Sequence, residues 1–125
     1  MRTLVTPLLF VGAILAQDAP HLALKVLYAG VPDHARTAGW REFLQPKVDR
    51  FTVIDVTQLT REAAGDADVV ILDCPDPIVR DAAGKPTRIA VPRPQAVDAD
   101  FGLPTIVVGG MAMITDGLHL KSNWL

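Results

Sequence analysis

The 125-residue sequence lacks several features that would assign it to a protein class at once. It has a single cysteine, Cys74, so no disulfide can form within the chain. Its 12 Lys and Arg residues are outnumbered by 14 Asp and Glu residues, and this balance excludes the broad positive field of a nucleic-acid-binding protein. Neither GxGxxG nor GxxxxGK[ST] occurs, so no dinucleotide, P-loop nucleotide or other cofactor is predicted.

The composition itself is that of a globular domain. Half of the residues are hydrophobic, 21% are charged and 6% are aromatic, which excludes a disordered polar chain and a collagen-like or coiled-coil fibre. A chain of this length forms one domain with a modest core.

The first 16 residues predict a secretory signal peptide. Arg2 supplies a positive start, residues 4–15 are apolar apart from Thr6, and small residues precede a polar segment after Ala16. Cleavage after Ala16 leaves residues 17–125 as a single exported domain, periplasmic or extracellular. The apolar run is shorter than the ~20 residues that span a bilayer, so no stable membrane span is expected after cleavage. A buried N-terminal helix or strand and a permanent anchor are the alternatives.

Four short runs rich in Val, Ile and Leu predict β-strands. They cover residues 23–30, 51–56, 68–73 and 105–110. Continuous apolar runs of this kind are typical of strands that are buried on both faces of a parallel sheet.

Helical segments are predicted between these strands. Apolar residues recur at steps of three or four and predict a helix over residues 36–49, which Pro46 should kink. The residues of this spacing are Trp40, Phe43, Leu44, Val48 and Phe51. Shorter helical segments are predicted over residues 60–64 and 111–118. Strands that alternate with helices predict a flavodoxin-like α/β fold, with an open, mainly parallel sheet of about four strands and flanking helices.

Residues 75–104 differ from the rest because they hold six of the ten prolines. Within them, residues 78–91 predict a β-hairpin with a turn at Gly84, which we interpret as an excursion from the sheet. The segment is basic through Arg80, Lys85, Arg88 and Arg93. A solvated hairpin explains this charge, and contact with an anion or a partner is the alternative.

Ligands of open α/β sheets bind beyond the carboxyl ends of the strands, and several chemically able residues fall there. The candidate ligand-binding residues are Asp33, His34, Asp73, Asp76, Gly109 and Gly110; Asp55 and Cys74 fall at the same edge.

Three interpretations of this edge remain open. Cys74 could be a nucleophile activated by His34, although a lone cysteine at a strand end is more often a small buried residue. Asp33, His34, Asp73 and Asp76 could bind a divalent metal, but no metal-binding motif supports this, and loop aspartates usually form turns and caps; we therefore predict no metal. The backbone at residues 109–110 could approach a ligand, or it could simply turn sharply between a strand and a helix.

The strands at residues 25–30, 68–73 and 104–110 resemble those of the class I glutamine amidotransferase-like superfamily, and within it the trehalose-utilisation (ThuA-like) branch. In catalytic members the last of these strands leads into a Gly-x-Cys-x-Gly elbow. Here the elbow is Gly109-Gly110-Met111-Ala112-Met113, without the nucleophilic cysteine. The resemblance therefore implies that amide hydrolysis is lost or was never present, and it implies a link to carbohydrate use.

The prediction from the sequence is an exported, non-catalytic module that binds a ligand or a partner, with carbohydrate or an anion as the small molecule. A hydrolase that uses Cys74 or an Asp/His-bound metal is the first alternative. A non-functional remnant of a longer protein is the second. An exposed fourth strand could pair with another copy of the chain, so a homodimer is also considered.

Overall fold

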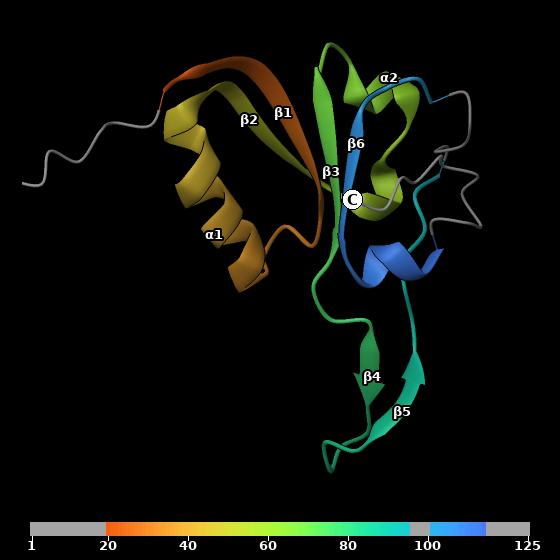
Figure 1. Ribbon diagram of the computed structural model, residues 1–125. Helices are drawn as coiled ribbons and strands as arrows, with labels where there is room; N and C mark the ends of the chain where they lie inside the picture. The colour runs from red at the N-terminus through yellow and green to blue at the C-terminus, as the bar shows by residue number, and fades with distance from the viewer. Residues whose placement is uncertain (1–19, 96–100, 115–125) are drawn as a thin grey trace, which may run out of the picture.

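The computed structural model describes residues 20–95 and 101–114, so the predicted signal peptide lies outside the described residues. Four parallel strands form one sheet in the order β2-β1-β3-β6 (Figure 1). The strands are β1 (Leu22–Gly30), β2 (Val48–Asp55), β3 (Val69–Cys74) and β6 (Thr105–Gly109). The predicted flavodoxin-like, parallel α/β class is confirmed, and each predicted strand is present within three residues of its predicted start.

Helical segments cover both faces of the sheet. The helix α1 (Ala35–Leu44) packs on one face, where Trp40 and Leu44 contact a cluster built around Val26, Tyr28 and Ile71. The opposite face carries a short helix and two 3-10 turns, which contribute Leu59, Ala64 and Met111 to the larger cluster. These segments are η2 (Val56–Gln58), α2 (Arg61–Ala64) and η3 (Gly110–Ile114).

The helix predicted over residues 36–49 is too long. The α-helix ends at Leu44, and Pro46 lies in the 3-10 turn η1 (Gln45–Lys47) that follows it. Val48 and Phe51 belong to β2, where they join the same core cluster as the helix. The spacing of three and four continued across the helix–strand junction, so it could not show where the helix ended. Phe43, also assigned to the buried face, is 57% exposed.

The two central strands meet the expectation of burial on both faces, and the outer two do not. Val26 to Gly30 of β1 and Val70 to Cys74 of β3 are all buried. In contrast, β6 is only partly covered by the described residues, and its Ile106 is 51% exposed. Both central strands therefore end at the carboxyl edge of the sheet in buried residues, Gly30 in β1 and Cys74 in β3.

The predicted hairpin is present and extends away from the sheet (Figure 1). It consists of β4 (Ile78–Arg80) and β5 (Pro86–Ile89), paired antiparallel. Asp81 organises the turn, because its carboxylate accepts hydrogen bonds from the backbone of Ala83 and Lys85, both at 2.9 Å. Gly84 has a φ of 81°, a conformation that glycine adopts without strain.

The helix predicted over residues 111–118 is a 3-10 turn as far as Ile114, and its remainder lies outside the described residues. None of the helices in residues 20–95 and 101–114 is long and apolar enough to cross a membrane.

Candidate functional site

The strand order singles out the carboxyl ends of β1 and β3, where the direction of the crossovers reverses. From β1 the chain crosses to β2 on one side, and from β2 it crosses to β3 on the other side of β1. In open α/β sheets, the point where the direction of crossing reverses is where ligands bind. The residues that end β1 and β3 are therefore the first to consider.

Asp73, the next-to-last residue of β3, is fully buried at this point. Tyr28 of β1 lies beside Ile71 in the parallel register, so Tyr28 and Asp73 share one face of the sheet. The Tyr28 hydroxyl donates a hydrogen bond to Asp73 Oδ2 at 2.6 Å.

The first turn of α1 covers this pair. Arg36 Nε lies 3.3 Å from Asp73 Oδ2, and Arg36 Nη2 donates to the carbonyl of Pro75 at 3.0 Å. The Arg36 side chain keeps 36% of its surface exposed, whereas that of Asp73 has none. A partly exposed arginine side chain therefore covers a fully buried carboxylate.

The start of α1 is fixed by two side chains. His34 caps the helix, because its Nδ1 accepts the backbone N–H of Arg36 at 3.0 Å. The buried Thr37 hydroxyl donates to the carbonyl of Val31 at 2.6 Å, and its oxygen lies 3.3 Å from the Tyr28 hydroxyl. These contacts tie the first turn of α1 to the end of β1, next to Asp73.

The second oxygen of Asp73 has no hydrogen-bond partner among the described residues, although it is buried. It faces Gly109, the last residue of β6, whose φ is 61°. A Cβ at residue 109 would lie 3.1 Å from this Oδ1, 3.2 Å from Arg36 Nη2 and 2.6 Å from the carbonyl oxygen of Cys74. Glycine thus allows β6 to approach the ion pair closely.

The electrostatics of the cluster keep Tyr28 protonated. Burial, followed by the hydrogen bond to Asp73, raises the pKa of Tyr28 to about 12. The phenol is therefore a permanent donor to Asp73 at neutral pH.

Cys74 lies on the other face of β3 from Asp73, since neighbouring strand residues alternate. It is 2% exposed and packs in the cluster that contains Leu72 and Met111. Burial raises the pKa of its thiol, and the charges of Asp73 and Asp76 raise it further. An activated nucleophile needs the opposite shift. Within the described part of the chain no hydrogen bond joins Cys74 to His34, whose Nδ1 is occupied by the helix cap.

The remaining sequence-predicted residues have local roles. Asp55 accepts the backbone N–H of Thr57 at 2.8 Å, and Asp76 accepts that of Ile78 at 3.1 Å. Asp33 is exposed, and Gly110 is buried against Pro77. No three His, Cys, Asp or Glu side chains of residues 20–95 and 101–114 are grouped so that they could hold a metal ion. The structure therefore brings Asp73 and Gly109 together. His34 contacts the cluster only through the backbone of Arg36, and Asp33 and Asp76 lie outside it.

Sequence reasoning missed Tyr28, Arg36 and Thr37. Tyr28 reads as one more apolar residue in a buried strand, and Arg36 as the solvated start of a helix. The sequence held one signal for this pair: the only tyrosine of the chain, Tyr28, lies in one predicted strand, and Asp73 ends another. Comparison with known proteins adds no assignment: no protein family, no curated protein and no solved structure matches this chain.

Proposed function

We propose that this protein is a non-catalytic module that binds a small neutral molecule at the carboxyl edge of β1 and β3. The observation that carries the proposal is the unpartnered Oδ1 of Asp73, buried beneath Arg36 where the crossovers diverge. A buried carboxylate oxygen without a partner costs stability, so its presence needs an explanation. A hydrogen-bond donor on a ligand supplies that partner.

The charges of the cluster favour a neutral ligand over an anion. Asp73 and Arg36 form a pair without net charge, and the free oxygen of the pair can only accept a hydrogen bond. A hydroxyl group satisfies this oxygen without adding charge, whereas an anion would be repelled by it. Arg36 uses Nε and Nη2 toward Asp73 and Pro75, and the guanidinium has further N–H groups that could donate to an acceptor on the same ligand. In this proposal the ligand meets Arg36 first and reaches Asp73 as the guanidinium moves aside.

Adjacent donors and acceptors are the chemistry of a sugar, and the resemblance to the ThuA-like branch of the class I glutamine amidotransferase-like superfamily supports the same ligand class. Two features support a role without catalysis. The elbow at residues 109–113 lacks cysteine, and the pKa of the Cys74 thiol is raised rather than lowered. The predicted signal peptide would place this binding outside the cytoplasm.

The test is thermal unfolding of the chain with neutral mono- and disaccharides, alongside inorganic phosphate and divalent metal ions. A ligand that binds only the native state at 100 times its Kd adds about 2.7 kcal/mol to the free energy of unfolding. We expect one group of sugars to raise the Tm of the native chain.

The matched variants are Asp73→Asn and Asp76→Asn, which remove the same charge at the same edge. Asp73→Asn should abolish the sugar-dependent shift, because an amide nitrogen can take the place of the accepting oxygen. Asp76→Asn should retain it, since Asp76 only bonds the backbone of Ile78. A panel without any shift, or an equal shift in both variants, contradicts the proposal.

A further inference from the structure

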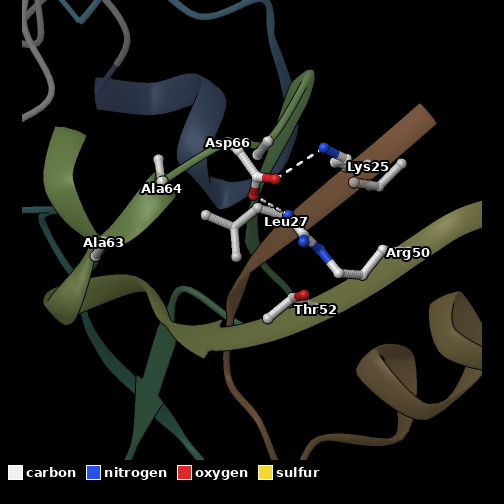
Figure 2. Close-up of a pocket in the computed structure, with 10 residues that line it drawn as sticks. Lys25, Leu27, Arg50, Thr52, Ala63, Ala64 and Asp66 are labelled. Atoms are coloured by element: carbon white, nitrogen blue, oxygen red, sulfur yellow. Dashed lines mark hydrogen bonds and ion pairs between the residues drawn. The ribbon is translucent and has the colours of Figure 1, made fainter.

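A second region with converging charges lies at the opposite, amino edge of the sheet. A depression of about 310 Å³ opens there between β1, β2 and the segment that joins α2 to β3 (Figure 2). The polar side chains in its wall are Lys25, Arg50, Thr52 and Asp66. Small residues at 63–65 and 67 line the rest of the depression together with Val26 and Leu27.

Two cations face each other in this depression. Lys25 and Arg50 are register partners on the parallel strands β1 and β2. Like charges in such positions destabilise a sheet unless an anion lies between them. Asp66 supplies the anion: its Oδ2 accepts a hydrogen bond from Lys25 Nζ at 2.8 Å, and its Oδ1 accepts one from Arg50 Nη2. Figure 2 shows the two interactions meeting at the one carboxylate.

The carboxylate is held in an exposed position. The side chains of Lys25, Arg50 and Asp66 are 43%, 48% and 60% exposed. Exposed ion pairs contribute little to stability, so the exchange of this carboxylate for another anion has a small cost. The hydrogen bonds from Arg50 and Lys25 hold the pKa of Asp66 well below its usual range, which shows that the two cations favour a negative charge at this point.

We propose that Lys25 and Arg50 form an anion-binding site in which Asp66 is a tethered, displaceable occupant. The chemical class that fits is a phosphate group. Its charge of about −1.5 to −2 at neutral pH suits the two cations and exceeds the single charge of the carboxylate that it must displace. The exposed Thr52 hydroxyl, two residues after Arg50 and on the same side of β2, is a donor for another phosphate oxygen.

The other nearby carboxylate does not compete for the lysine ammonium. Asp68 accepts the backbone N–H of Lys25 at 2.8 Å, which leaves the ammonium of Lys25 to Asp66. This site is independent of the proposed carboxyl-edge site, since the two lie at opposite ends of the strands.

The experiment is a titration of the chain with inorganic phosphate, followed through the backbone amide resonances of Lys25, Arg50 and Asp66. Asp66→Asn removes the occupant and should tighten phosphate binding at least tenfold relative to the native chain. Lys25→Met in the Asp66→Asn background should reverse this gain, because one of the two cations is lost. Each change lies at the surface, so the fold should persist, which circular dichroism checks.

Asp49→Asn is the matched control. It removes an equal charge near the start of β2, where Asp49 pairs with His21 at 2.9 Å. A tenfold gain in Asp66→Asn without a gain in Asp49→Asn supports the site. An equal gain in both variants shows a general effect of net charge and overturns the proposal, as does the absence of any gain.

Discussion

Each edge of the sheet has an arginine–aspartate ion pair, and the two pairs differ in burial. At the carboxyl edge, Arg36 meets an aspartate that has no exposed surface, and at the amino edge Arg50 meets one whose side chain is 60% exposed. Water can replace a lost partner at the amino edge and cannot at the carboxyl edge. Counting ion pairs therefore says little about the stability of this fold. Burial decides how much the free energy of unfolding changes when one partner is lost.

The difference follows from the position of each aspartate in the sheet. Asp73 lies on a central strand between β1 and β6 and beneath α1, so backbone and side chains enclose it from several sides. Asp66 lies in the connection before β3, where the chain has just left α2. The carboxyl edge thus encloses its aspartate, whereas the amino edge leaves its aspartate exposed to solvent.

The largest difference should come from two glycines with positive φ. Gly109→Ala adds backbone strain and a Cβ 2.6 Å from the Cys74 carbonyl, and should lower the free energy of unfolding by about 4 kcal/mol. Gly65→Ala at the amino edge, where φ is 55° and the nearest atom is 4.0 Å away, should lower it by about 1–2 kcal/mol from strain alone. Urea unfolding of both variants measures the two values. Equal losses would mean that the enclosed geometry at residue 109 is wrong.

The arginines give the next contrast. Arg36→Met leaves the buried Asp73 charge without a cation and should lower the free energy of unfolding by about 3 kcal/mol, near the lower end for buried pairs because Arg36 is partly exposed. Arg50→Met should change it by less than about 1 kcal/mol, since Asp66 keeps Lys25 and water. Chemical denaturation in low and high salt checks both. A loss in Arg50→Met as large as that in Arg36→Met would remove the distinction between the edges.

The smallest contrast concerns pH. Tyr28→Phe removes a charge-assisted hydrogen bond and should lower the free energy of unfolding by about 2 kcal/mol at neutral pH. The pKa of Tyr28 is raised in the folded state, so its contribution is complete below pH 10 and is lost as the pH rises toward 12. The Phe variant should lack this alkaline loss in a series of denaturation curves.

The amino edge should respond on the acid side. Because the pKa of Asp66 is lowered, its contribution is present at neutral pH and is lost as the pH falls below the usual aspartate range. Asp66→Asn is therefore expected to flatten the acid side of the stability profile and to leave the alkaline side unchanged. A change on the acid side in Tyr28→Phe, or on the alkaline side in Asp66→Asn, would contradict the assignment of the alkaline loss to Tyr28 and of the acid loss to Asp66.

The strands could be predicted from the sequence because their signal is local. Runs such as residues 68–73 are apolar without interruption and end at charged or flexible residues, so composition alone marks them. The end of α1 could not be predicted in the same way. Val48 and Phe51 continue the helical spacing although they lie in β2, and both sets of residues pack against the same cluster.

The candidate site was only partly predictable for a different reason. Asp73 and Gly109 could be placed at the carboxyl edge because each ends a strand. Their partners depend on register and on the position of α1, since Tyr28 and Asp73 are 45 residues apart in the sequence. The amino-edge depression could not be found at all, because it needs β1, β2 and the α2–β3 connection to meet.

The projecting hairpin offers a practical handle. The exposed turn at residues 81–85 is closed by local hydrogen bonds, and it lies at the tip of the hairpin that extends from the carboxyl end of β3 (Figure 1). Exposed loop tips tolerate inserted sequence well. An affinity tag or a fluorophore placed between Ala83 and Gly84 would therefore allow the protein to be immobilised or labelled while the amino-edge depression, at the opposite end of the strands, remains open for titration.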